Sequence, residues 1–465
     1  MLSIVHKAFM IAGSGMMIMS HGFLRGEEAN ASLNPVCFHP SPAGAPVVLV
    51  EEGIPHAKIV VAAKAKKEQR GIFYMAAKEF AEHVKLATGA ELPIMGDDEP
   101  CGGVLVLIGN SLETERRQIT ANDLPPEGFR VKTFDSGVAI VGGPAAAGVP
   151  ESDRGTLFGV YDFLERYLGI RWYYPGDDGR VVPKRNDLRI NPIHYTDAPH
   201  RILRVQLAGG DPTLYPRYRA GKSTPVNIFC HTPLRFDTLK AHPECLELDR
   251  SGNRNPGMPC YGNPKTAELF VQDVADFYEK GVRTPWLHWD GKTLWHAPTD
   301  KVIAISPPDK SIACCCDHCR KLFDADADPL GRASRIMADY VVRVARLVKE
   351  RWPEKIVYYL PYLNYTLPPR DLQLPDNVVV CVCLMYGVND KEPQVAKAHS
   401  EMIRGWKQAG GKKVFVWTYP CWPVEDTALP FQYPHVLQEF EKRHRDDIAG
   451  EGSVSYTHLR AHETA

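Results

Sequence analysis

The chain has 465 residues, a length that predicts two or three domains. Charged residues make up 24% and hydrophobic residues 44%, which is typical of a globular protein. The formal net charge of −1 argues against nucleic acid or an anionic membrane surface as the partner.

The first residues of the chain have the pattern of a secretory leader. An apolar run at residues 8–19 follows Lys7, and it is too short to span a bilayer. The triplet Ala-Asn-Ala at residues 29–31 offers a cleavage site between small residues. We therefore expect residues 1–31 to be a signal peptide, and the mature protein to be secreted or periplasmic without a membrane anchor. A disordered leader or a misassigned start is the alternative.

Short apolar runs alternate with two amphipathic helices from residue 46 to about residue 190. Residues 104–108 are entirely apolar, which predicts a buried central strand. The helices are expected near residues 73–86 and 156–168, and a glycine follows each of them. The pattern predicts an α/β, sandwich-like domain over residues 46–190.

From about residue 200 the pattern changes to strands separated by helices, which predicts a parallel sheet. Helices are expected at residues 265–280, 333–351 and 394–408. Seven strands are expected, at residues 202–207, 226–230, 257–261, 302–306, 356–362, 378–384 and 413–418. These elements favour an incomplete (β/α)8 TIM barrel over residues 200–452, and a doubly wound sheet is the alternative.

The end of the chain does not continue this pattern. A helix is expected at residues 431–448, and an eighth strand should follow Gly450-Glu451-Gly452. Instead, residues 453–465 form a polar peptide that resembles a translated adaptor sequence. We expect this tail to be non-native and the barrel to lack its eighth strand. A natural polar tail is the alternative.

Several segments of the first half carry a family resemblance. Residues 59–61 (IVV), 76–80 (AAKEF) and 88–94 (TGAELPI) resemble the N-terminal domain of family 67 α-glucuronidases and family 20 hexosaminidases. Residues 154–165 (RGTLFGVYDFLE) and 169–176 (GIRWYYPG) continue the likeness. The resemblance implies a domain of the kind that precedes a glycoside hydrolase barrel.

The second half, over residues 200–450, resembles the family named domain of unknown function 4838. The residues that carry this resemblance are His242-Pro243-Glu244, Cys260, Asn263-Pro264, Ser306, Asp309, Cys314-x-Cys316-x-x-Cys319 and Val416-Trp417-Thr418-Tyr419. The family often has Asp where Thr418 stands here. The resemblance implies a barrel related to glycoside hydrolases, and it supplies neither a substrate nor assigned catalytic residues.

Barrel enzymes carry their chemistry at the carboxyl ends of strands, and most glycosidases need two carboxyl groups there. Asp309 follows the strand expected at residues 302–306 through two prolines, which favours a fixed general acid or base. Asp290, in His-Trp-Asp-Gly, is the second catalytic candidate. Glu244 and Asp211 are weaker ones. For each carboxylate, an ordinary role in a turn or loop is the alternative.

Other polar and aromatic side chains are expected near the strand ends, where ring faces suit sugars. The substrate-binding candidates are Arg204, His231, Asn263, Tyr362, Trp417 and Tyr419. A structural role is the alternative for the histidine, and an internal salt bridge is the alternative for the arginine. The expected partner is a carbohydrate, and the sequence does not indicate the oligomeric state.

Three close cysteines, Cys314, Cys316 and Cys319, together with His318, have the right elements for a structural zinc site. A fourth ligand would have to come through the fold, from Cys230, Cys260 or Cys381. Export would instead favour a disulfide, and free thiols are the third alternative. No other cofactor is expected.

Known phosphate, dinucleotide and HExxH motifs do not occur in the sequence. The first functional hypothesis is therefore a glycoside hydrolase-like enzyme that acts on a polysaccharide or uronate-containing glycan by carboxylate acid/base catalysis. The alternative is a non-catalytic glycan-binding protein on a degenerate hydrolase barrel.

Overall fold

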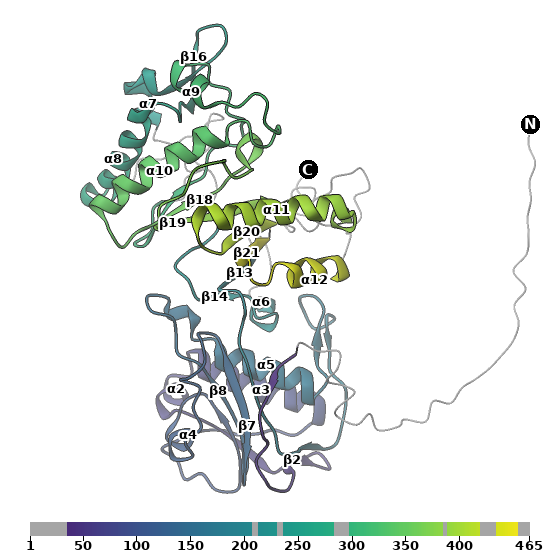
Figure 1. The fold of residues 1–465 in the computed structure, drawn as a ribbon. Helices are drawn as coiled ribbons and strands as arrows, with labels where there is room; N and C mark the ends of the chain where they lie inside the picture. Colours follow the sequence, from purple (N-terminus) through teal and green to yellow (C-terminus); the bar gives the residue numbers. More distant parts are fainter. Residues whose placement is uncertain are drawn as a thin grey trace, which may run out of the picture.

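The computed structural model describes residues 35–206, 213–229, 236–282, 297–384, 388–418 and 434–453. The chain forms two parts, each built around its own seven-stranded sheet, and the parts stack end to end (Figure 1). The signal peptide expected at residues 1–31 lies outside the described residues. Within the described part of the chain, no helix combines the length and apolar character needed to cross a bilayer.

The first sheet is mixed. Its strands, in spatial order, are β1 (Cys37–Phe38), β12 (His194–Asp197), β7 (Phe129–Phe134), β8 (Gly137–Gly142), β6 (Val104–Ile108), β4 (Ala57–Val61) and β5 (Ile94–Gly96). The run β8-β6-β4-β5 is parallel, and β7 is antiparallel to both of its neighbours. The apolar residues 104–108 form β6, which lies inside the sheet between β8 and β4 and has its last four residues buried, as the apolar run predicts.

Two helices, α3 (Ile72–Thr88) and α5 (Gly155–Tyr167), pack together and cover one face of this sheet. Phe80 and Phe163 are fully buried between them. Gly89 ends α3 in the left-handed conformation with φ of 80°, which a residue with a side chain rarely adopts. The smaller elements are α2 (Ala63–Glu68), α4 (Leu112–Arg116), β2 (Val47–Glu51), β3 (Ile54–Pro55), β9 (Arg171–Trp172), β10 (Arg180–Val181) and β11 (Leu188–Ile190). The α/β, sandwich-like architecture is confirmed.

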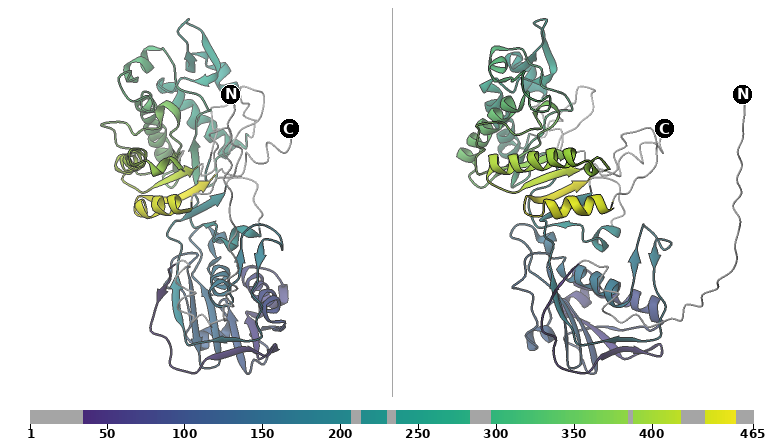
Figure 2. Two further views of the ribbon diagram at one scale, coloured as in Figure 1. Left: turned by 90° about the vertical axis from the view of Figure 1, so that its right-hand side faces the viewer. Right: turned by 45° about the vertical axis from the view of Figure 1, so that its right-hand side comes forward.

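The second sheet is a curled half-barrel (Figure 2). Its strands, in spatial order, are β14 (Gly221–Lys222), β13 (Leu203–Gln206), β21 (Ile448–Ser453), β20 (Val414–Thr418), β19 (Val378–Leu384), β18 (Ile356–Tyr359) and β17 (Val302–Ile305). All pairs from β13 to β17 are parallel, and only the short β14 is antiparallel. The incomplete barrel is therefore confirmed.

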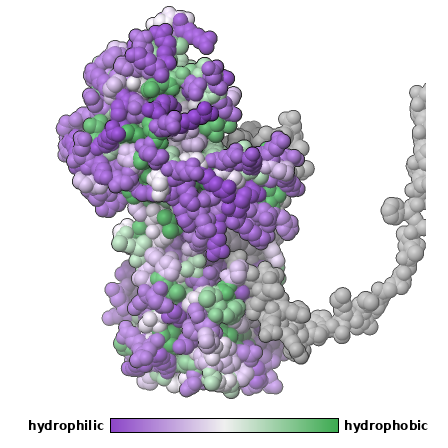
Figure 3. All heavy atoms as spheres, in the orientation of Figure 1, coloured by the Kyte–Doolittle hydropathy of each residue, from purple (hydrophilic) through white to green (hydrophobic). Residues whose placement is uncertain are grey.

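Amphipathic helices flank this sheet. The long ones are α8 (Pro264–Lys280), α10 (Ser334–Arg351), α11 (Pro393–Gly410) and α12 (Pro434–Arg443). Trp406 of α11 and Phe440 of α12 are fully buried in the core that the helices share with the sheet. Hydrophilic side chains predominate over α11 and α12 on the face shown in Figure 3. The shorter elements are α6 (Leu214–Arg217), α7 (Phe236–Ala241), α9 (Asp317–Leu322), β15 (Leu246–Leu248) and β16 (Arg254–Pro259).

Two of the strands that the sequence predicts for the barrel are not found in it. The strand expected at residues 257–261 belongs largely to β16, which pairs antiparallel with β15 rather than joining the barrel. An Asp249 turn closes this hairpin, because its Oδ1 accepts hydrogen bonds from the backbone N–H groups of Ser251 and Asn253. Residues 226–229 form no strand, although Val226 is buried against the sheet.

The prediction that the barrel lacks its eighth strand is also wrong, because β21 occupies that place in the sheet. This strand lies between β13 and β20, and its last residue, Ser453, belongs to the tail that was expected to be non-native. A Cβ atom would lie 2.5 Å from Leu203 at Gly450 and 2.3 Å from Ile228 at Gly452. The close approach of neighbouring residues requires glycine there, and this is why the strand lacks the apolar pattern.

Candidate active site at the carboxyl edge of the half-barrel

The parallel sheet has two different faces. Ile303 and Ile305 of β17 pack against the helices, whereas Val302 and Ala304 belong to a separate core on the concave face. The other parallel strands alternate in the same way. In the described parallel strands, the side chains on the concave face are apolar, aromatic or cysteine, so none of them is a carboxylate.

Asp309 lies just beyond the carboxyl end of β17 and is exposed. The preceding residues, Pro307 and Pro308, are buried and anchor the chain. The backbone N–H of Lys310 donates to the carbonyl of Pro308 at 2.6 Å, so Asp309 occupies the centre of a tight turn. This hydrogen bond holds the backbone of Asp309 in a defined turn at the end of the strand.

Tyr362 follows β18 and is partly exposed. Burial is the main cause that raises the pKa of its hydroxyl, and the nearby Cys383 and Asp309 raise it further. Trp417, also partly exposed, pairs with Cys383 in the register of β20 with β19. The fold thus brings Asp309, Tyr362, Cys383 and Trp417 to one edge of the sheet, from four consecutive strands.

The connection that carries Asp309 is held from two sides. The backbone N–H of Ile312 donates to Oδ1 of Asn364 at 3.0 Å, and the Asn364 amide donates back to the Ile312 carbonyl at 2.9 Å. Glu247, which sequence analysis missed, accepts a hydrogen bond from the N–H of Ala313. Burial raises the pKa of the Glu247 carboxyl. These contacts make the Asp309 connection a structured part of the fold.

Arg204 and Asn263 lie elsewhere and make structural contacts. Arg204 forms an ion pair of 2.8 Å with the buried carboxylate of Glu127, in the first part of the chain. Asn263 caps the start of α8, where its side chain accepts from the N–H of Lys265 and donates to the Glu244 carbonyl. Arg204 therefore forms the internal salt bridge that was the alternative to a role in substrate binding.

Three other candidates, Asp290, His231 and Tyr419, lie outside the described residues. A cavity of about 770 Å³ lies between the two parts of the chain, at the amino end of β13. Arg201, Arg219 and Asp162 line this cavity and form ion pairs with one another or with neighbouring side chains. Because barrel chemistry belongs to the carboxyl ends of strands, the cavity is at the wrong end for an active site.

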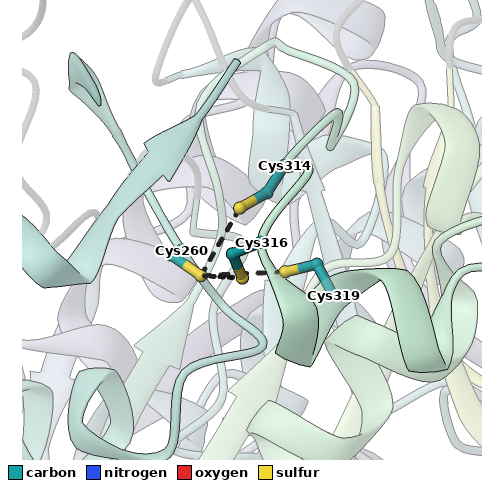
Figure 4. Close-up of side chains that lie close together, drawn as sticks. All are labelled: Cys260, Cys314, Cys316 and Cys319. Carbon is teal, nitrogen blue, oxygen red and sulfur yellow. Dashed lines mark hydrogen bonds between the residues drawn. The ribbon is translucent and has the colours of Figure 1, made fainter. Parts of the chain in front are cut away.

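The predicted metal ligands Cys314, Cys316 and Cys319 converge, and Cys260 joins them (Figure 4). The four sulfur atoms lie within 4.8 Å of one another. His318 is exposed and stands outside this group. Of the cysteines considered as a fourth ligand, the fold therefore selects Cys260.

Glu451 on β21 is a second carboxyl group that sequence analysis did not select. Its Oε1 accepts a hydrogen bond of 2.6 Å from the Thr418 hydroxyl. Burial raises the pKa of Glu451 to about 7, and the Glu441 carboxylate adds to the rise, while Thr418 and Arg201 oppose it. Glu451 pairs in register with Val416, which packs on the helix side, so its side chain points away from the concave face. The Gly-Glu-Gly sequence after the last helix is the sequence signal that could have identified Glu451.

Comparisons with known proteins give low similarity over most of the chain. A GH115 4-O-methyl-α-glucuronidase with specificity for decorated arabinogalactans is 12% identical, with a TM-score of 0.47, over 90% of this chain and 56% of that one. A β-N-acetylhexosaminidase from Bacteroides fragilis is 12% identical, with a TM-score of 0.40, over 90% of this chain and 86% of that one. A GH20 exo-β-N-acetylglucosaminidase from Vibrio harveyi is 10% identical, with a TM-score of 0.38, over 91% and 70% of the two chains.

This chain therefore spans little more than half the length of the glucuronidase. No curated protein sequence matches it. A family model, described as domain of unknown function DUF4838, matches residues 174–422, which is more than half of the chain and includes β13, Asp309 and the four clustered cysteines. The chain belongs to the DUF4838 family.

Proposed function

We propose that the protein is a glycoside hydrolase-like enzyme that binds a polysaccharide or uronate-containing glycan at the carboxyl edge of the half-barrel. The observation that carries this proposal is the exposed carboxylate of Asp309 on the same edge as the partly exposed rings of Tyr362 and Trp417. Aromatic ring faces pack against the apolar faces of sugars, and a carboxyl group beside them can exchange a proton with a glycosidic oxygen.

In this mechanism Asp309 is the general acid or base. Hydrolysis needs a second carboxyl group, about 5–5.5 Å away for retention or about 6.5–9.5 Å away for inversion. The described strands offer none on their concave face, so the second group would come from a connection between elements. Asp290 is our candidate for that role, because it lies in a polar and aromatic segment before β17.

A non-catalytic glycan-binding protein is the second candidate. The same observation favours it, since aromatic rings without a carboxylate pair bind sugar but do not cleave it. The two candidates differ in one outcome, because only the enzyme releases new reducing ends.

The test is a panel of neutral and uronate-containing polysaccharides, with binding and reducing-end release both measured. We expect wild-type protein to bind at least one class, and Trp417→Ala to weaken that binding about tenfold, as the loss of one aromatic contact implies. Tyr173→Ala is the matched control, because this ring is 66% exposed and belongs to the first part of the chain. Absence of binding to every glycan, or equal losses in both variants, would refute the proposed site.

We also infer that the protein is exported, with residues 1–31 as a signal peptide, and that residues 46–190 and 200–452 are its two domains. The leader pattern supports the first inference, and the two separate sheets support the second. A secreted or periplasmic location suits an enzyme whose polymeric substrate lies outside the cell.

A further inference from the structure

The four clustered sulfur atoms have the spacing of a tetrahedral metal site. Cys260 Sγ lies 3.5 Å from Cys316, 3.7 Å from Cys319 and 3.6 Å from Cys314. Four thiolates at the usual zinc–sulfur distance of about 2.3 Å would stand about 3.8 Å apart. A disulfide would instead bring two sulfurs to about 2.05 Å and leave the other two without a role.

The backbone around the cluster is arranged for close approach to sulfur. The N–H of Leu248 donates to Cys314 Sγ at 3.3 Å. A Cβ atom at Gly262 would lie 2.6 Å from Cys319 Sγ, so this segment can pass the cluster only as glycine. Hydrogen bonds from backbone N–H groups to thiolates orient the ligands of a metal site and balance their charge.

Cys315 supplies an internal comparison. It lies between two members of the cluster in the sequence, yet its Sγ donates to the carbonyl of Ala313 and is not part of the group. The chain alternates so that Cys314 and Cys316 turn inward while the residue between them does not. Such selection is expected of a ligand set and not of a chance gathering of cysteines.

We propose that Cys260, Cys314, Cys316 and Cys319 bind one structural zinc ion. Four protein ligands close the site, so no position remains for water or substrate, and the role is structural rather than catalytic. Cys260 comes from the end of the β15–β16 hairpin, next to the start of α8, and the other three come from the connection that follows Asp309 and from α9. The ion therefore joins the hairpin to the segment that carries Asp309. The proposal is independent of the proposed function.

The test begins with the wild-type protein, full length and purified under mildly reducing conditions. We expect elemental analysis to give one zinc ion per chain, and titration of the thiols with a mercurial to release it. Replacement with Co²⁺ is expected to give the intense sulfur-to-cobalt charge-transfer band and the visible bands of tetrahedral thiolate coordination. Protein without bound metal, a disulfide found by mass spectrometry among the four cysteines, or an iron–sulfur absorption spectrum would each overturn the proposal.

Variants then assign the ligands. Cys260→Ser and Cys314→Ser are expected to lose nearly all bound zinc, whereas the matched control Cys315→Ser keeps it. Equal loss in Cys315→Ser would overturn the ligand assignment. If the ligand variants do not fold, the cobalt spectrum of the wild-type protein and of Cys315→Ser still decides the case, because tetrahedral thiolate bands must appear in both.

Discussion

At the scale of single residues, Glu451 has a strongly shifted pKa. Its raised pKa of about 7 has burial as its main cause, and the neighbouring Glu441 carboxylate adds to it. A carboxyl group of this kind is a functional-site candidate in general, but its side chain faces the helix layer. We therefore assign it an effect on stability.

The sign of that effect follows from proton binding. The folded protein holds the Glu451 proton up to about pH 7, whereas the group ionises near its ordinary value of 4.5 when the chain unfolds. The folded state binds more protons between these values, so stability falls as pH rises through this window. Glu451→Gln is expected to raise the stability at pH 8 by about 2 kcal/mol and to change it little at pH 4.5.

Thermal melting of wild type and variant at the two pH values checks this prediction. Glu401→Gln is the control, because this glutamate of α11 is exposed. The explanation fails if Glu451→Gln melts below wild type at pH 8, or if the two variants behave alike.

Some site residues could be identified from sequence and others could not. Asp309 follows the apolar run expected as a strand at residues 302–306, and Tyr362 ends the strand expected at residues 356–362, so the sequence alone placed both near strand ends. Cys260 could not be preferred to Cys230 or Cys381, because only the path of the β15–β16 hairpin brings it to the other three. Long-range convergence of this kind leaves no local signal.

At the scale of elements, β21 shows where pattern-based prediction fails. Its inward positions are Gly450 and Gly452, which the neighbours Leu203 and Ile228 require, so hydrophobic periodicity is absent. The strands β18, β19 and β20 were correctly predicted because they are buried on both faces and are almost entirely apolar. The hairpin β15–β16 was mistaken for a barrel strand because local sequence does not encode the pairing partner.

An ion pair between β13 and the first part of the chain is a second feature at the scale of elements. The Glu127 side chain is fully buried and pairs with Arg204 of β13. Arg204→Met leaves this carboxylate without its cation, which we expect to cost on the order of 3 kcal/mol of stability. Chemical denaturation should show the loss, and Arg70→Met, whose side chain is 79% exposed, should show almost none. A loss below about 0.5 kcal/mol in Arg204→Met would contradict the role of the pair.

At the scale of the whole molecule, β21 connects β13 to the run of four parallel strands from β20 to β17. It pairs with β13 on one side and with β20 on the other, so the sheet depends on residues close to the end of the chain. Residues 454–465 lie outside the described part, and we propose that the fold does not need them.

Two truncations test this organisation. A chain that stops after residue 453 is expected to melt within about 1 °C of the full-length protein. A chain that stops after residue 446 lacks β21 and is expected to aggregate or to lose its cooperative transition, because β13 and β20 then have unpaired edges. The organisation described here is wrong if the shorter chain melts like the longer one.

The central claim is that Asp309 acts chemically on a glycan at the carboxyl edge of the half-barrel. The most direct measurement is the rate of reducing-end release by Asp309→Asn, on whichever polysaccharide the wild-type protein cleaves, with binding measured in parallel. Loss of general acid or base catalysis predicts a rate at least about 100-fold lower with binding retained. Asp326→Asn, an exposed aspartate in the connection that follows β17, is the control and should keep the wild-type rate. Hydrolysis by Asp309→Asn at the wild-type rate would contradict the claim.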